Sequence, residues 1–278
     1  MTLRCGRMAY TNVVPLYAAF DCGVLEYPGT LAPGVPAQLN AMLADGSLDL
    51  SPISAMAWAQ RADEYVLLPD LCIGARDEVV SVLLASDRPP ALLDGATVYV
   101  TGESASGYNL LRVLLERRYG IHPEYVRAPD VLSRARAGQP ALLIGDPAID
   151  ALETIDAGHI YDLGHLWRDW TQTQSVFGVW AARRDAYERH PGEVRACVLA
   201  MTDAYSWARA NRDRVVECAQ HQRPRPAAFY EAYYDKLNFT YHAAAQRGLA
   251  AFCRELHAIG AIDRVPSVVP ENLDAVAC

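Results

Sequence analysis

Short apolar runs alternate with amphipathic segments through the first half of the chain, and this alternation is the feature that most constrains its fold. Short apolar runs bounded by turns are typical of buried strands, whereas apolar residues three and four apart are typical of helices. The runs predict strands over residues 3–8, 48–53, 66–71 and 79–85. They predict helices over 13–21 with Asn12 as N-cap, over 35–44 with Gly46 at the end, and over 54–62 with Ser54 as N-cap.

A Pro89-Pro90 pair interrupts this pattern, and we expect the chain to cross there into a second lobe. Beyond it, the sequence predicts strands over 97–101, 125–127, 141–144 and 175–182, a helix over 110–118, and a helical pattern almost to the end. Strands that alternate with helices favour largely parallel sheets with ligand sites beyond the strand ends. We therefore predict an α/β chain with a cleft between two lobes, residues 1–88 with 183–278 and residues 89–182.

Charge and hydropathy exclude two classes of partner. The net charge of the 278 residues is −8, and no stretch gathers Lys or Arg into the basic stripe of a nucleic-acid binder. The longest apolar runs are far shorter than a membrane span, and no apolar signal core follows the first basic residues. We expect a cytoplasmic protein without nucleic-acid or membrane partners. The oligomeric state is left open, a homodimer included.

The familiar local motifs of metal and cofactor sites do not occur. The seven cysteines form no CxxC pair and are expected to be reduced thiols, and the seven histidines show no ligand spacing. GxGxxG, GxxxxGK[ST] and GxSxG are absent, and the single lysine, Lys236, has no flanking motif. We expect no cofactor and no metal, although local spacing leaves open a metal site assembled from distant residues.

Polar residues that follow the predicted strands are the candidates for a binding site. They are Tyr10, Asn12, Ser54, Ser81, Ser104, Ser106 and Asp146. Hydroxyls and backbone amides at helix starts suit carboxylates and phosphates, so together these groups could bind a small anion. The alternatives are structural: Asn12, Ser54 and Ser106 as ordinary helix caps, Asp146 as a turn residue and Tyr10 as a core or rim aromatic.

Seven segments in order along residues 3–265 carry a resemblance to a known family. They are YTNVVPL (10–16), LDLSPIS (48–54), VVSVLL (79–84), ALLIGDPAI (141–149), YDLGHLW (161–167), VFGVWAAR (176–183) and GLAAFCREL (248–256). Together they resemble the chorismate dehydratases of the futalosine route to menaquinone. The resemblance implies a type 2 periplasmic-binding-protein-like fold with the ligand between two α/β lobes.

The resemblance also implies a reaction, the loss of water from chorismate to give 3-[(1-carboxyvinyl)oxy]benzoate. The ring becomes aromatic, and the enolpyruvyl carboxylate of the substrate itself takes the proton, so positioning matters more than a strong protein base. By motif position Asn12 and Ser81 would be the catalytic residues. The expected substrate contacts are Tyr10, Ser54, Ser104, Ser106 and Asp146.

Two segments depart from the family pattern. Thr171 is followed by Gln172-Thr173-Gln174-Ser175, and the start of the helix in the second lobe reads Glu103-Ser104-Ala105-Ser106. A carboxylate at position 103 would disfavour a dianionic substrate unless it points outward.

Two other functions remain open from the sequence. One is the sister enzyme that splits a cyclic futalosine derivative to give 1,4-dihydroxy-6-naphthoate, and no histidine lies in a cleft motif to serve as its base. The other is a non-catalytic solute-binding protein for a small carboxylate, which would normally carry an export signal.

Overall fold

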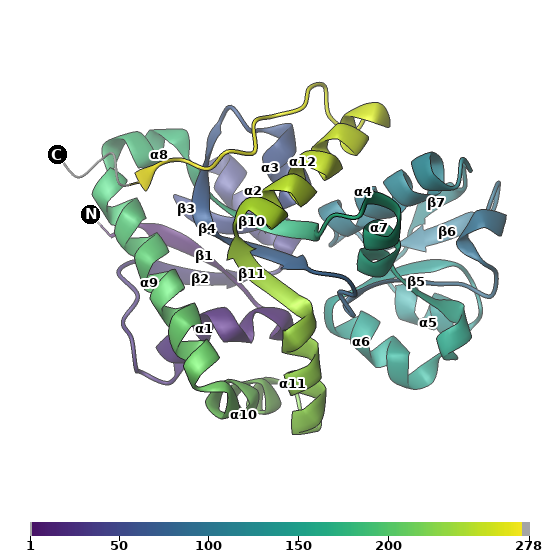
Figure 1. Cartoon of the computed structure of the whole chain (residues 1–278), viewed down its shortest axis with the longest axis horizontal. Helices are drawn as coiled ribbons and strands as arrows, with labels where there is room; N and C mark the ends of the chain where they lie inside the picture. The colour runs from purple at the N-terminus through teal and green to yellow at the C-terminus, as the bar shows by residue number, and fades with distance from the viewer. Residues whose placement is uncertain (1, 274–278) are drawn as a thin grey trace.

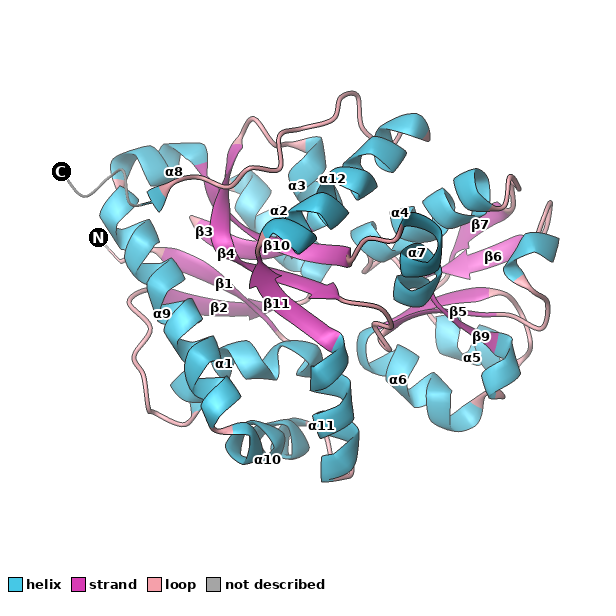
Figure 2. Cartoon of the chain, in the orientation of Figure 1, coloured by secondary structure: helices cyan, strands magenta, loops and turns pink. Residues whose placement is uncertain are grey.

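Two β-sheets, each covered by helices, divide the molecule into two lobes that lie side by side (Figure 1). The computed structural model describes residues 2–273, and of residue 157 the backbone alone. Within that range the sheet of the first lobe has the strand order β11-β4-β10-β3-β1-β2, and that of the second lobe β7-β6-β8-β5-β9 (Figure 2). The predicted α/β class with two lobes is confirmed.

The strands are short except for the two long ones that lead toward the second lobe. In the first lobe they are β1 (Arg4–Met8), β2 (Thr30–Gly34), β3 (Leu50–Ser54), β4 (Tyr65–Ala75), β10 (Ser175–Arg183) and β11 (Leu237–Tyr241). In the second lobe they are β5 (Val82–Ala85), β6 (Thr97–Val100), β7 (Glu124–Arg127), β8 (Ala141–Ile144) and β9 (Ile160–Asp162). All five residues of β3 are buried, as expected for a strand in the middle of a covered sheet, although two of them are serines.

Helices cover both faces of the sheets. In the first lobe they are α1 (Val14–Asp21), α2 (Pro36–Asp45), α3 (Ala55–Gln60), α8 (Arg184–Arg189), α9 (Pro191–Ala210), α10 (Arg212–Gln222), α11 (Ala227–Lys236) and α12 (Ala243–Ala258). In the second they are α4 (Ala105–Val113), continued by a π turn (Leu114–Arg118), α5 (Val131–Arg136), α6 (Gly145–Thr154) and α7 (Leu163–Thr171). Short 3₁₀ turns cover Thr11–Val13, Pro90–Leu92 and Ala157–His159.

The ends of α2 follow from local chemistry. Pro36 occupies the start of the helix, where its missing N–H costs nothing. Gly46 ends the helix in the left-handed conformation with φ of 84°, which a glycine adopts without steric cost. The predicted end of this helix is confirmed.

The chain crosses between the lobes earlier than the proline pair suggests. Strand β5 pairs with β8 and β9 in the second sheet, so the outward crossing lies in residues 76–81. The return crossing lies in residues 172–174, because β10 belongs to the first sheet. The crossing predicted at Pro89-Pro90 is therefore wrong, and residues 82–88 and 175–182 change lobes relative to the predicted division.

The sheets are mixed, not largely parallel as predicted. Strands β1, β2 and β3 run parallel, as do β6, β7 and β8. Strand β10 returns along β4, which places it antiparallel to both β4 and β3, and β11 is antiparallel to β4. The sequence predicts none of β2, β9 and β11, and β11 interrupts the helical pattern expected almost to the end of the chain. Tyr230, Tyr233 and Tyr234 of α11 are buried and form a packing face.

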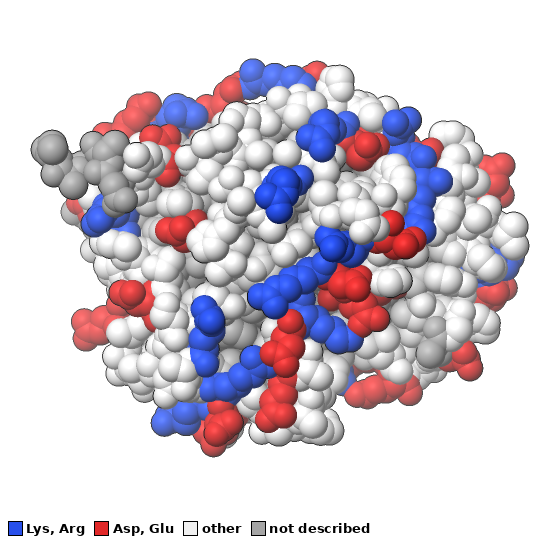
Figure 3. Space-filling view, in the orientation of Figure 1, with Lys and Arg blue, Asp and Glu red and all other residues white. Residues whose placement is uncertain are grey.

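Six cysteines lie within the described range and all six are free thiols, whereas Cys278 lies outside it. Two pairs approach each other: the Sγ atoms of Cys22 and Cys218 are 3.4 Å apart, and those of Cys5 and Cys197 3.9 Å apart. Across residues 2–273, no helix combines the length and the apolar character that a bilayer crossing requires. Figure 3 shows Lys and Arg interspersed with Asp and Glu on the face that it draws.

Candidate functional site

A cleft that is partly open to solvent lies between the lobes. Loops and strand ends of the first lobe line one side of it, and the other side is lined by Val79, Ser81, Val82 and residues 103–107 and 144–145. Six of the seven predicted site residues line this cleft: Tyr10, Asn12, Ser54, Ser81, Ser104 and Ser106. Residues up to 96 positions apart in the sequence thus come together, which local patterns alone could only suggest.

Asn12 lies in the cleft but is not a helix cap. It sits inside the 3₁₀ turn Thr11–Val13, and neither that turn nor α1 has a side-chain cap. The expected capping role is therefore wrong. Its Oδ1 atom is buried and accepts no hydrogen bond from any described residue. A buried acceptor without a partner costs about 1–3 kcal/mol, so this oxygen is suited to a donor on a ligand.

Ser54 and Ser104 combine capping with a place in the cleft. The Ser54 hydroxyl accepts from the Ala57 amide at 3.1 Å, at the start of α3, as predicted. The Ser104 hydroxyl accepts from the Gly107 amide at 3.1 Å, at the start of α4. Each cap hydroxyl still carries a proton that it can donate, so capping and ligand binding are compatible at both positions.

Ser81 lies on the crossing segment and is 3% exposed. It precedes β5, whereas the sequence predicted a strand from residue 79. The hydroxyl donates to the Val79 carbonyl at a long 3.3 Å, and the phenol of Tyr233 lies beside it. Burial raises the pKa of Tyr233, and its hydroxyl has no well-formed hydrogen bond within the described range. The Ser81 hydroxyl is thus weakly engaged and can turn toward a ligand.

Two hydrogen bonds join the lobes at the walls of the cleft. The Ser106 hydroxyl, on α4, accepts from the Met56 amide of α3 at 3.1 Å. Tyr10 donates from its phenol to Glu103 Oε2 at 2.8 Å. Burial and this hydrogen bond raise the pKa of Tyr10, so the phenol keeps its proton. Glu103 lines the mouth of the cleft rather than pointing wholly away from it.

Asp146 lies beside the cleft rather than in its lining. It is in the first turn of α6 and accepts from the Thr11 hydroxyl at 2.6 Å. Arg223 of the first lobe lies 3.6 Å from its other oxygen. The structure therefore places Asp146 at a joint between the lobes, where its carboxylate is already occupied, and brings the other six predicted residues into the cleft.

The apolar wall of the cleft was not predicted from the sequence. The wall consists of Met8, Ile73, Val79, Val82, Ile144, Phe177 and Leu237. These residues belong to ordinary apolar patterns of strands and helices, so they could not be told from core residues. An apolar wall with a few convergent polar groups is typical of small-molecule sites.

The electrostatics of the cleft are unusual for an anion site. Among the described residues that line it, none is Arg, Lys or His, and Glu103 is the one formal charge. Hydrogen-bond donors are instead hydroxyls and the amides at the start of α4, where the helix dipole favours negative charge. Within residues 2–273, no group of three His, Cys, Asp or Glu side chains is arranged to hold a metal ion.

Solved structures with the same architecture define the class. Protein AF1704 from Archaeoglobus fulgidus aligns with a TM-score of 0.74 at 19% identity, over 94% of this chain and 98% of that one. The periplasmic aliphatic sulphonate binding protein SsuA from Escherichia coli aligns with a TM-score of 0.66 at 19% identity, over 98% and 93%. The chain thus has the two-lobed fold of periplasmic binding proteins, as predicted.

Sequence comparison then identifies the family. The model of a menaquinone biosynthesis family matches residues 3–258, and the chain belongs to this family. It is 33% identical over 270 residues to the chorismate dehydratase of Thermus thermophilus, covering 90% of this chain and 94% of that protein. It is 28% identical over 218 residues to the 1,4-dihydroxy-6-naphthoate synthase of the same organism, covering 77% of each.

Proposed function

We propose that this protein is a hydro-lyase that dehydrates chorismate to 3-[(1-carboxyvinyl)oxy]benzoate. The main observation in favour of the proposal is that Asn12 and Ser81 both line one cleft, which has an apolar wall. Membership of the menaquinone biosynthesis family and the likeness to a chorismate dehydratase over nearly the whole chain support it.

The reaction breaks the C3–H and C4–O bonds and releases one water molecule. Aromatisation of the ring supplies much of the driving force. The titratable side chains in the described lining are Tyr10 and Glu103, and they are hydrogen-bonded to each other. This arrangement favours the enolpyruvyl carboxylate of the substrate as the acceptor of the C3 proton. The protein then contributes orientation and hydrogen bonds to the charge that develops.

Asn12 and Ser81 have complementary roles in this scheme. The unpartnered Oδ1 of Asn12 accepts from a donor on the substrate, for which the C4 hydroxyl is the candidate, and so fixes the ring. The Ser81 hydroxyl donates to the reacting carboxylate and holds it over C3. Ser54 and Ser104 donate from their cap hydroxyls to the carboxylates of the bound dianion.

The 1,4-dihydroxy-6-naphthoate synthase reaction is the less favoured alternative. The relative with that activity is less similar and matches less of the chain. The described lining also offers no histidine as a base for it. The cytoplasmic location and the oligomeric state stay predictions.

A comparison of the two substrates tests the proposal. Purified protein is incubated separately with chorismate and with the cyclic futalosine derivative, and products are separated by chromatography. We expect chorismate to be consumed and the futalosine derivative to stay intact. Consumption of the futalosine derivative alone would replace the proposal by the sister reaction. Tight binding of chorismate without turnover would point to a solute-binding protein.

A further inference from the structure

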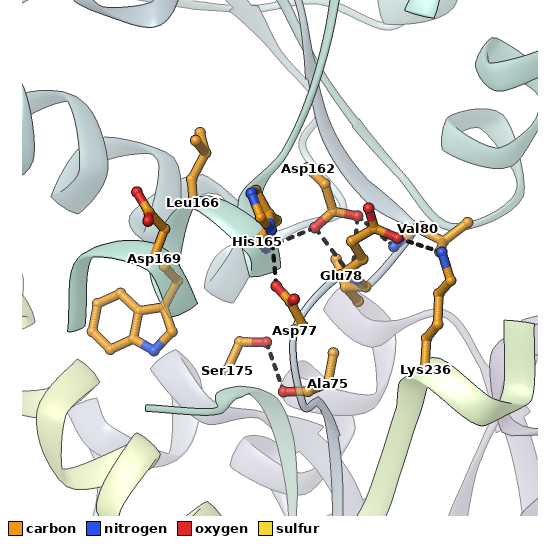
Figure 4. A network of polar contacts seen from close by, with 12 residues as sticks. Ala75, Asp77, Glu78, Val80, Asp162, His165, Leu166, Asp169, Ser175 and Lys236 are labelled. Carbon is orange, nitrogen blue, oxygen red and sulfur yellow. Dashed lines mark hydrogen bonds and ion pairs between the residues drawn. The ribbon is translucent and has the colours of Figure 1, made fainter. Parts of the chain in front are cut away.

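The outward crossing between the lobes, residues 76–81, is held by the carboxylate of Asp162 at the start of α7 (Figure 4). Oδ2 accepts from the Val79 amide at 3.0 Å and the Val80 amide at 2.7 Å. Oδ1 accepts from the His165 amide at 3.1 Å, which caps α7. One side chain thus ties the first turn of α7 to the two residues that precede Ser81.

Val80 has an unfavourable backbone conformation at this point. Its φ is 67°, in the left-handed region, which β-branched residues rarely adopt. Such a conformation persists only where surrounding contacts over-determine it. The Asp162 bond to the Val80 amide is one such contact, and the Gly145 amide donates to the Ser81 carbonyl at 2.8 Å on the other side.

Gly164 allows α7 to approach the crossing segment closely. A Cβ atom at this position would lie 2.6 Å from the Asp77 carbonyl oxygen and 3.1 Å from the Val79 nitrogen. The His165 ring nitrogen Nδ1 lies 2.9 Å from Asp77 Oδ1, and Lys236 pairs with Glu78 on the far side of the segment. Contacts therefore hold the crossing segment along most of its length, and Ser81 is the last residue of this segment.

We propose that Asp162 is a positioning residue: by holding Val80 in the left-handed conformation it directs the Ser81 side chain into the cleft. The proposal rests on the function proposed above, in which the Ser81 hydroxyl contacts the substrate. It also gives a role to the DLG part of the YDLGHLW segment, which lies outside the cleft lining. Asp162 touches no substrate in this scheme and acts through the backbone of Val80.

Asp162→Asn is the informative variant. It keeps the size of the side chain but can present an amide NH₂ toward the amides of Val79 and Val80, where an acceptor is required. Burial raises the pKa of Asp162, and the amides of Val79, Val80 and His165 lower it less. The variant is nearly the same size as the native side chain, and thermal unfolding checks that it folds.

The matched control is Asp130→Asn. Asp130 also caps a helix, accepting from the Ser133 amide at 3.0 Å at the start of α5, but it is exposed and has no bond to the crossing segment. The rescue variant is Val80→Gly in the Asp162→Asn background, because glycine adopts positive φ without being held. Because glycine at positive φ also relieves strain in the fold, kcat is compared at a temperature where every variant is folded, and a residue that mattered only for stability would leave kcat unchanged there.

The experiment measures kcat and KM for chorismate, with thermal unfolding alongside. We expect Asp162→Asn to lose about 100-fold in kcat with KM changed less than about threefold, since misplacing a reacting group mainly affects the transition state. Asp130→Asn should have the kcat of the wild type. The double variant should have a kcat at least about tenfold higher than that of Asp162→Asn. Wild-type kcat in Asp162→Asn, or a double variant no faster than Asp162→Asn, would overturn the proposal.

If Asp162→Asn does not fold, kcat and KM are measured for Asp162→Glu, which keeps the charge but displaces the acceptor oxygens. The same criteria then apply to that variant. If wild-type protein does not turn over chorismate, the proposed function fails separately. The positioning role is then judged from crystal structures of the wild type and Asp162→Asn. A changed φ at Val80 with a displaced Ser81 hydroxyl would support it, and an unchanged segment would refute it.

Discussion

The amide oxygen of Asn12 is buried in the cleft and unsatisfied within the described chain. Native structures rarely leave a buried acceptor in this state, and functional sites are where they do. The nearby serines differ, because Ser54, Ser104 and Ser106 each accept a backbone hydrogen bond. At the scale of single residues, Asn12 is therefore the group with the most to gain from a ligand.

Replacing Asn12 by alanine should nearly abolish turnover. We expect kcat to fall at least about 100-fold, as when a group that stabilises a transition state is removed. The free energy of unfolding should be unchanged or slightly higher, because the variant no longer buries an unpaired acceptor. Steady-state kinetics and urea unfolding check both parts. Wild-type turnover by Asn12→Ala would remove Asn12 from the mechanism.

Glu103 offers a test of charge in the cleft. Glu103→Gln keeps an acceptor for the Tyr10 hydroxyl but removes the negative charge at the mouth. We expect KM for dianionic chorismate to fall about three- to tenfold at low salt, and less at high salt because ions screen the repulsion. Glu124→Gln, on exposed β7, is the control for loss of a charge elsewhere. An unchanged or higher KM in Glu103→Gln would show that this carboxylate does not oppose binding.

At the scale of elements, an ion pair fastens the start of β1 beside the start of β3. Asp49 accepts from the Arg4 amide at 2.8 Å and from the Arg4 guanidinium at 2.7 Å. Burial raises the pKa of the Asp49 carboxyl, but the hydrogen bonds and charge of Arg4 outweigh burial and leave it below its usual value. A carboxyl with a lowered folded-state pKa stabilises the fold above its unfolded pKa.

This shift predicts a pH dependence of stability. The contribution of Asp49 should be complete at neutral pH and be lost as the pH falls from about 4 through the lower folded-state pKa. Asp49→Asn should therefore lower the free energy of unfolding by about 1 kcal/mol at pH 7 and have less effect near pH 3. Urea unfolding at both values checks this, with Arg4→Gln as the partner variant. A loss that is equal at both pH values would contradict the assignment.

The elements also show what the sequence could and could not predict. The run at residues 141–144 predicted a strand correctly, because a continuous apolar run suits a strand that is buried on both faces. The segment Val79-Val80-Ser81 has the same composition, yet it is no strand, because Asp162, 82 residues away, holds Val80 in a turn. Asn12 likewise resembled a cap, and only the tertiary fold turns it into a cleft residue.

In the molecule as a whole, ion pairs between the lobes form a clamp that consists of Arg223 and Arg225 of the first lobe with Asp150 and Glu153 of the second. Arg225, with a side chain 6% exposed, extends from the first lobe and pairs with Asp150 and Glu153 on α6 of the second. Arg223 also pairs with Asp150. Together with the Tyr10–Glu103 and Met56–Ser106 hydrogen bonds, this clamp holds the cleft in the arrangement described above.

Asp150 and Glu153 provide a matched pair of variants for the clamp. Asp150→Ala removes the less exposed of the two carboxylates that pair with the buried Arg225 guanidinium. We expect the free energy of unfolding to fall by about 2–4 kcal/mol. Glu153, whose side chain is 65% exposed, should contribute less than about 1 kcal/mol when replaced by alanine. Urea unfolding measures both. Equal effects of the two variants would mean that burial of Arg225 does not govern the strength of the clamp.

The most direct measurement is the mass of the product formed from chorismate by the whole protein. Purified protein is treated with a chelator, mixed with chorismate without any added cofactor, and its products are analysed by mass spectrometry and proton NMR. We expect the loss of one water molecule and the appearance of a meta-substituted aromatic ring, with Asn12→Ala forming little of this product. Chorismate that stays intact, or a product that retains the water, would show that the protein is not a chorismate dehydratase.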